Sequence, residues 1–259
     1  MSPVQLFRGI LAYLTIPPLT AGVCLGAIAD VRWFRKSKIK AQVFPRTWGK
    51  VLCYIANIRV RVEGKEHLDP AMPYIFIGNH ASMADIMTFS GYIDHDYRWI
   101  AKKELFAIPV FGSGMQAVDF ISIDRSRGRA AVKSLNDAAQ RIAGGASVIL
   151  FPEGTRSPDG HLRPFKTGAI MLALKAGVDV VPVGFNGTHQ ALPKGNVLSR
   201  GGDVVLRIGT PIPTKNFKAK DKQILADLLH QRVAELLDDC HLPLPEAHQS
   251  SAAVPATAK

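Results

Sequence analysis

The stretch Tyr74-Ile-Phe-Ile-Gly-Asn-His-Ala-Ser-Met-Ala-Asp85 sets the architecture of this chain, because an apolar run passes through a polar turn into a helical pattern. Aromatic and β-branched residues favour strands, so residues 74–78 predict an apolar strand. The helical pattern then covers residues 83–92. A strand that leads directly into a helix is the repeating unit of an α/β domain.

The same alternation continues along most of the chain. We predict an α/β domain over residues 61–244, because strand-like and helical runs alternate through it. Residues 245–259 are small, polar and proline-containing, which predicts a disordered tail. Strands are expected at 59–63, 74–78, 99–101, 120–123, 148–151, 180–184 and 204–208, and helices at 83–92, 127–144, 167–176 and 220–239.

Composition excludes several classes of protein. The chain has 259 residues, of which 47% are hydrophobic and 20% are charged, so it is neither a disordered nor a fibrous protein. Its three cysteines, Cys24, Cys53 and Cys240, are far apart and form no C-x-x-C pair. This spacing excludes a disulfide framework and a zinc site built on thiolates.

The positive charge is concentrated at the N-terminus. Residues 1–65 contain eleven Lys and Arg against two acidic residues, and so carry +9 of the formal net charge of +11. A nucleic-acid-binding protein usually spreads its basic surface over the folded domain. Basic charge beside apolar residues is instead what an anionic membrane surface attracts. We therefore expect a membrane partner and no nucleic acid.

Residues 1–60 are predicted to form a helical membrane-anchoring module. Residues 9–29 carry no charge and would be about 32 Å long as one helix, enough to span a bilayer. Pro17 and Pro18 predict a break, which favours a shallow hairpin or an interfacial helix over a span. A second apolar stripe at helical spacing covers residues 44–55. Signal-peptide cleavage after Ala29, a single-pass span, and a core helix at 44–55 stay open as alternatives.

His80 and Asp85 are candidates for a catalytic pair. They can meet only if His80 lies in the turn and Asp85 in the first turn of the helix. The carboxylate would then hold one ring nitrogen and leave the other as a general base. A purely structural pair is the alternative. Because the chain has no G-x-S-x-G motif, the nucleophile would be a substrate hydroxyl or water.

A second polar turn follows the strand predicted at 148–151, in Phe151-Pro-Glu-Gly-Thr-Arg-Ser157. Gly154 allows a close backbone approach, and Arg156 offers a two-pronged donor suited to phosphate. Lys102 and Arg125 lie at two further strand ends. Solvated surface residues are the simpler explanation of each cation taken alone.

Together these segments resemble the glycerolipid acyltransferases, specifically the 1-acylglycerol-3-phosphate acyltransferases. Residues 79–85 match the NHx4D block of that family, and residues 102–105 match its next block. Residues 120–125, 151–157 and 180–183 match the three motifs that follow. Two positions depart from the family pattern: Asp119 stands where Gly is usual, and Asp179 where Pro is usual. The first change could alter the pocket near the phosphate.

The resemblance implies a mixed sheet flanked by helices and direct acyl transfer. His80, oriented by Asp85, would activate the 2-hydroxyl of lysophosphatidic acid toward acyl-CoA or acyl-carrier protein, giving phosphatidic acid. It implies no metal and no cofactor, and a place at a membrane, which we expect to be the cytoplasmic face of a bacterial inner membrane. Glycerol 3-phosphate, lysophospholipids and lyso-ornithine lipids stay open as acceptors. The substrate-binding residues implied are Lys102, Arg125, Glu153, Gly154, Thr155 and Arg156.

Overall fold

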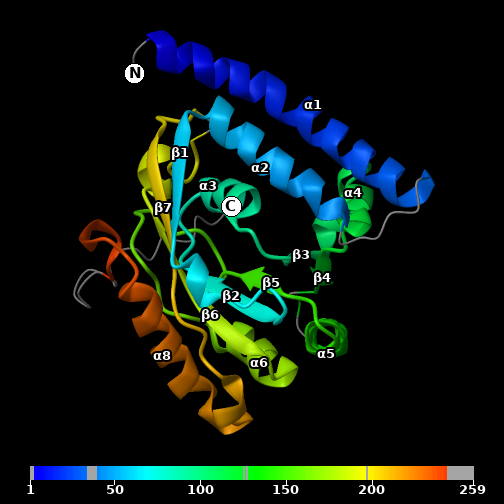
Figure 1. Cartoon of the computed structure of the whole chain (residues 1–259), viewed down its shortest axis with the longest axis vertical. Helices are drawn as coiled ribbons and strands as arrows, with labels where there is room; N and C mark the ends of the chain where they lie inside the picture. Colours follow the sequence, from blue (N-terminus) through cyan, green and yellow to red (C-terminus); the bar gives the residue numbers. More distant parts are fainter. Residues whose placement is uncertain (1–2, 34–39, 125, 127, 197, 244–259) are drawn as a thin grey trace, which may run out of the picture.

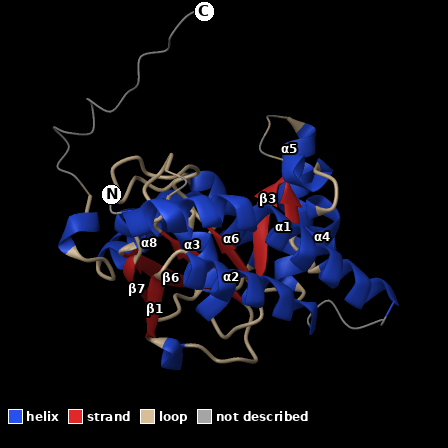
Figure 2. Ribbon diagram, turned by 90° about the horizontal axis from the view of Figure 1, so that it is seen from above, coloured by secondary structure: helices blue, strands red, loops and turns tan. Residues whose placement is uncertain are grey.

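The computed structural model describes residues 3–33, 40–124, 126, 128–196 and 198–243. Its centre is one mixed sheet of seven strands in the order β1-β7-β6-β2-β5-β3-β4, flanked by helices (Figure 2). All pairs are parallel except β6 and β7. The strands are β1 (Ile58–Glu63), β2 (Tyr74–Gly78), β3 (Arg98–Lys102), β4 (Ile121–Ile123), β5 (Val148–Leu150), β6 (Asp179–Asn186) and β7 (Gly202–Ile208).

The predicted strands are confirmed, and so are the four predicted helices of the domain, although the last is shorter than expected. These helices are α3 (Ala84–Tyr92), α5 (Arg129–Ala143), α6 (Thr167–Ala176) and α8 (Lys222–Ala234). Two helices that sequence analysis did not predict are α4 (Phe111–Ala117) and α7 (Thr188–Ala191). Six short 3-10 turns complete the fold, at Lys40–Gln42, Lys65–His67, Lys103–Ala107, Thr214–Asn216, Ala219–Asp221 and Asp239–His241.

Strand β2 separates two hydrophobic cores, because successive side chains of a strand point to opposite faces. Ile75 and Ile77 pack with α5, α6 and α8 on one face of the sheet. Tyr74 and Phe76 pack with α2 (Val43–Ile55) and α3 on the other. The sheet is therefore covered on both faces, as parallel strands require.

Helix α1 (Pro3–Trp33) is a single helix of 31 residues with Pro17 and Pro18 inside it. The predicted break at this proline pair is therefore wrong. The helix packs against α2 and α4, and this packing supports it as one continuous element. Just beyond the prolines, Trp48 of α2 donates from Nε1 to Thr20 Oγ1 at 3.0 Å. The stretch Gly9–Trp33 has the length and composition of a helix able to cross a membrane.

Along its length α1 lies against the domain, beside α2 and α4 (Figure 1). Small side chains permit the close approach, since a Cβ added to Gly26 would meet Phe44, and one added to Gly114 of α4 would meet Cys24. The remaining surface of α1 exposes large apolar side chains, among them Leu6, Phe7, Ile10, Leu11, Tyr13, Leu14, Leu25 and Trp33.

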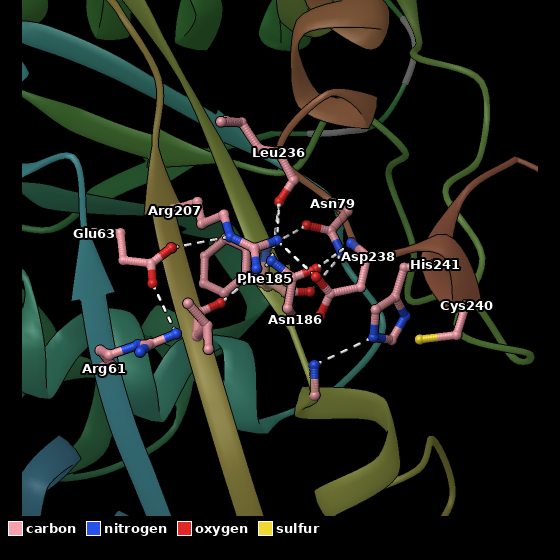
Figure 3. A network of polar contacts seen from close by, with 12 residues as sticks. Arg61, Glu63, Asn79, Phe185, Asn186, Arg207, Leu236, Asp238, Cys240 and His241 are labelled. Carbon is pink, nitrogen blue, oxygen red and sulfur yellow. Dashed lines mark hydrogen bonds and ion pairs between the residues drawn. The ribbon is translucent and has the colours of Figure 1, made fainter.

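The chain beyond α8 turns back to the sheet through a polar network (Figure 3). Arg207 of β7 donates to the Leu236 carbonyl at 3.1 Å and to Asp238 Oδ1 at 2.7 Å. Asp238 in turn donates its N–H to Asn186 Oδ1 of β6 at 2.8 Å. These contacts give residues 235–238 more hydrogen bonds than a further turn of exposed helix would. They explain why α8 ends at Ala234 and not at the predicted residue 239.

Helices α2 and α3 touch backbone to backbone, so Gly49 is a sensitive position in this interface. A Cβ at Gly49 would lie 2.5 Å from the Gly91 nitrogen and 2.5 Å from the Met87 carbonyl oxygen. We predict that Gly49→Ala lowers the free energy of unfolding by about 1–3 kcal/mol, measured by denaturant titration. Gly168→Ala on α6 is the control, because its Cβ meets nothing within 4 Å. Equal stability of the two variants would contradict the packing of α2 on α3.

Candidate active site

His80 and Asp85 meet at the carboxyl end of β2. The His80 Nδ1 donates to Asp85 Oδ2 at 2.8 Å, and the same oxygen accepts the N–H groups of Ala81 and Ser82 at 2.9 Å each. Asp85 lies in the first turn of α3 and is fully buried. The spatial pairing expected from the sequence is therefore present, and Nδ1 is committed to the carboxylate.

The other ring nitrogen of His80, Nε2, remains for chemistry. The imidazole stacks on Phe151 with 3.9 Å between ring centroids and 5° between planes. Its side chain is 14% exposed and lines an apolar cavity that is described below. A histidine held by a carboxylate on one side and a ring on one face presents Nε2 in a fixed direction.

The turn that carries His80 is tied to the loop after β5. The two strands are adjacent and parallel, with Ile77 opposite Leu150, so both loops leave the same edge of the sheet. The His80 N–H donates to Glu153 Oε1 at 2.7 Å, and the His80 carbonyl accepts the Ser157 N–H at 2.7 Å. Sequence analysis did not predict this pair of bonds, because they join residues more than 70 positions apart.

Glu153 lies behind His80 and not on the cavity wall. It is 3% exposed, and its Oε2 has no hydrogen-bond partner among the residues that the structure describes. Burial, with a smaller contribution from the nearby Asp85 carboxylate, raises the pKa of Glu153 to about 8. Glu153 therefore supports the His80 backbone, and the substrate contact expected of it stays a prediction.

Several cations face the mouth of the site. Lys102, at the end of β3, and Arg156 both line the cavity, and within the described part of the chain neither side chain has an ion-pair partner. The neighbouring Lys103 is used differently, since its Nζ lies 2.7 Å from Asp124 and holds the pKa of that carboxyl down at about 2. Arg125, also expected here, lies outside the described residues.

Gly154 and Thr155 line the cavity beside Arg156. Gly154 has φ +77°, a conformation that favours glycine. A Cβ at Gly154 would lie 2.9 Å from Lys166 Nζ, so the Lys166 ammonium group lies directly beside this loop. Sequence analysis assigned Lys166 no role, because its approach depends on the course of the chain between residues 157 and 166.

Two polar residues of the motifs are structural. Ser82 donates to the Leu192 carbonyl at 2.6 Å and accepts the Ala84 N–H at 2.9 Å, so its hydroxyl is fully used. Asn79 exchanges two hydrogen bonds with the backbone of Phe185, at 3.0 and 2.8 Å. Both residues fix the turn before α3 against the chain at and after the end of β6.

The side chain of Asp119 is not among the residues that line the cavity, whereas its neighbours Val118 and Phe120 are, so an effect of Asp119 on the pocket stays a prediction. Its carboxylate lies 2.9 Å from Arg141 and 3.5 Å from the buried Arg98, away from the cavity lining. Its φ of +65° explains why glycine suits this position. The ion pairs offset that backbone strain.

The cavity itself is apolar and has a volume of about 590 Å³, within the range of small-molecule sites. His80 and the cations lie at its polar end. Its apolar walls come from four helices and two strands, represented by Val23 and Ala27 of α1, Trp48 of α2, Ile86 of α3, Ile100 of β3, Met115 of α4 and Ile149 of β5. Among the residues that the structure describes, no three His, Cys, Asp or Glu are placed to hold a metal ion.

Comparisons with known proteins identify the class of protein to which this fold and site belong, which is that of the acyltransferases. The sequence model of the acyltransferase family matches residues 59–186. The solved structure of the 1-acyl-sn-glycerophosphate (LPA) acyltransferase PlsC of Thermotoga maritima matches with a TM-score of 0.72 and 29% identity, covering 90% of this chain and 95% of that one.

Curated relatives narrow the class to a family. The 1-acyl-sn-glycerol-3-phosphate acyltransferase of Limnanthes douglasii is 32% identical over 204 residues, which are 78% of this chain and 72% of the relative. Those of Cocos nucifera and Brassica napus are 31% and 34% identical over 79% and 74% of this chain. This chain belongs to the 1-acyl-sn-glycerol-3-phosphate acyltransferase family, as its motifs indicated. It spans 66% and 55% of the length of the last two relatives.

The buried Glu153 gives a testable pH dependence. Its pKa of about 8 in the folded state lies above that of an exposed glutamate, so folding binds its proton. The contribution to stability is full below about pH 4 and is lost as the pH rises toward 8. We predict that the free energy of unfolding falls over this range, and that Glu153→Gln makes the slope shallower, measured by denaturant unfolding at several pH values.

Glu153→Ala is the matched comparison, because it leaves the His80 N–H without an acceptor. We expect it to cost about 1–3 kcal/mol of stability at all these pH values, whereas Glu153→Gln keeps an acceptor in place. An unchanged slope in Glu153→Gln would show that Glu153 is ionised when folded.

Proposed function

We propose that this protein transfers an acyl chain from a thioester to the 2-hydroxyl of lysophosphatidic acid, which gives phosphatidic acid. The observation that carries this proposal is the His80–Asp85 pair at the polar end of an apolar cavity, beside Lys102 and Arg156. A base, an anion site and an apolar cavity are the three elements that a phosphate-bearing, acyl-bearing acceptor requires. The names of the relatives support the same reaction.

In the proposed mechanism the His80 Nε2 takes the proton of the 2-hydroxyl as its oxygen attacks the thioester carbonyl carbon. The carbon–oxygen bond forms and gives a tetrahedral intermediate, which collapses by breaking the carbon–sulfur bond. The thiolate then takes the proton from the imidazolium, so His80 returns to its neutral form. Asp85 keeps the proton on Nδ1 and stabilises the transient positive charge. The thioester is already activated, so the reaction needs no cofactor or metal.

Lys102 and Arg156 are proposed to bind the phosphate of the acceptor. Both line the cavity, and the guanidinium can donate two parallel hydrogen bonds to phosphate oxygens. Gly154 and Thr155 shape the loop that places Arg156. Arg125 is proposed to bind the same phosphate.

The apolar cavity is proposed to hold an acyl chain, and α1 is proposed to lie in one leaflet of a membrane. Because α1 packs along α2 and α4, it forms a wall of the cavity while its outer surface is apolar. A helix held against the domain along one side can bury only its outer surface in lipid, which favours a position in the interface over a span across the bilayer. We place it at the cytoplasmic face of a bacterial inner membrane, where acyl-CoA or acyl-carrier protein would be the donor.

The base is tested by thiol release from acyl-CoA in the presence of lysophosphatidic acid. We predict that His80→Ala lowers kcat by about 10²–10⁴, the usual contribution of general base catalysis. His67→Ala is the control, since His67 is an exposed histidine of a 3-10 turn outside the cavity lining. A fully active His80→Ala would reject the mechanism. Activity of the wild type only with another lyso-lipid would reject the acceptor.

The anion site is tested by Arg156→Gln. We predict that KM for lysophosphatidic acid rises about 10- to 100-fold, the value of one or two charge-assisted hydrogen bonds, while KM for acyl-CoA stays nearly constant. Arg232→Gln is the control, because Arg232 pairs with Glu235 on the exposed side of α8. If KM for the donor rises instead, Arg156 binds the donor and not the acceptor.

A further inference from the structure

A short segment between β3 and α4 exposes several apolar side chains to solvent. We call residues 103–110 the apolar knuckle. In it Leu105, Ile108 and Val110 are 37%, 46% and 37% exposed. Three apolar side chains grouped on one short segment are a candidate contact surface, whereas scattered ones need no explanation.

The backbone of the knuckle is fixed and strained. Val110 has φ +64° and ψ −54°, a conformation that β-branched residues rarely adopt. The Phe111 N–H donates to the Pro109 carbonyl at 2.7 Å, which closes a γ-turn around Val110. The Gly112 N–H donates to Ile108 at 2.8 Å and holds the turn against α4. These two hydrogen bonds fix the path of the backbone through Pro109 and Val110 into α4.

The knuckle lies at the edge of the cavity. Leu105, and Phe111 just after the knuckle, line the same cavity as His80. Helix α4 follows the knuckle and packs on α1, with Gly114 against Cys24. Helix α4 therefore contacts both α1 and the knuckle, and all three contribute residues to the lining of the cavity.

We propose that the knuckle inserts into the headgroup region of an anionic bilayer and seats the cavity mouth on it. Lys102 and Lys103 stand at its start, with Glu104 as its single acidic residue. Lys103 is paired with Asp124, so the positive charge beside the apolar side chains comes from Lys102, which is exposed and has no ion-pair partner among the described residues. Apolar side chains beside such a cation match the apolar and anionic layers of a membrane surface. This surface is separate from α1, and the proposal rests on the proposed function only in that a lipid acceptor must enter from the bilayer.

The insertion is tested with an environment-sensitive fluorophore on Ile108→Cys in a Cys240→Ser background. Cys24 and Cys53 are buried, and the background protein alone must take no label. We expect a several-fold rise in emission on vesicles of phosphatidylcholine and phosphatidylglycerol. The matched control is Ile224→Cys on α8, where the isoleucine is 62% exposed and emission should stay constant.

Equal emission at the two positions on vesicles would overturn the proposal. A rise at Ile108 without vesicles that grows with protein concentration would also overturn it, since a second copy would then cover the knuckle. The readout needs no catalysis. A wild type inactive on lysophosphatidic acid would therefore reject the proposed function and leave the insertion result to stand.

A second arm measures the consequence for turnover. We predict that Ile108→Glu lowers activity several-fold on lysophosphatidic acid in vesicles, and leaves activity unchanged on a short-chain acceptor in detergent solution. Ile224→Glu should change neither. Loss in both presentations would overturn the proposal, because Ile108 would then act on the folded site and not on the membrane contact.

Discussion

One carboxylate oxygen holds the geometry on which the site depends. Oδ2 of Asp85 accepts from the His80 ring and from the N–H groups of Ala81 and Ser82. A buried carboxylate is costly unless it is hydrogen-bonded, and these three donors compensate for its burial. They also make the turn, the imidazole and the start of α3 one rigid unit. The direction of Nε2 is thus set by backbone atoms as much as by the carboxylate.

This unit is positioned by the sheet. Because β2 and β5 are parallel neighbours, their loops emerge side by side, and Glu153 can reach the His80 backbone. A neutral Glu153 at this place avoids adding a second negative charge next to Asp85. The two acids therefore have different tasks, one orienting the ring and the other supporting the backbone. Lys102 and Arg156 differ from these two acids because their side chains line the cavity itself.

Local patterns predicted much of this fold. Strand β2 is a continuous apolar run between polar turns, and α6 begins and ends at the predicted residues. The His80–Asp85 contact followed from spacing, because the residues are close in the chain. Contacts between distant segments were not predictable in this way, and the hydrogen bond from the His80 N–H to Glu153 was not predicted for that reason.

The other differences have local physical causes. Helix α4 contains Gly112 and Gly114, which helix propensity disfavours, yet both glycines are needed where the backbone meets Phe106 and Cys24. Helix propensity also predicts a break at Pro17 and Pro18, yet α1 continues through them and packs on α2 and α4. In both helices, tertiary contacts outweigh the low helix propensity of the glycines and prolines.

The glycines of α4 and the prolines of α1 both bear on the proposed reaction, because they determine where α1 lies. An unbroken α1 reaches α4 only because Gly114 leaves room for Cys24, and their contact closes one side of the cavity. The wall of the cavity is thus also a helix whose outer surface is apolar. An acyl chain that moves between bilayer and cavity would meet apolar surface on both sides of α1, and only the phosphate would need the cations at the mouth. In the proposed reaction the polar groups of the protein would therefore lie at the boundary of an apolar path, and a lipid with one charged end would react without leaving the membrane.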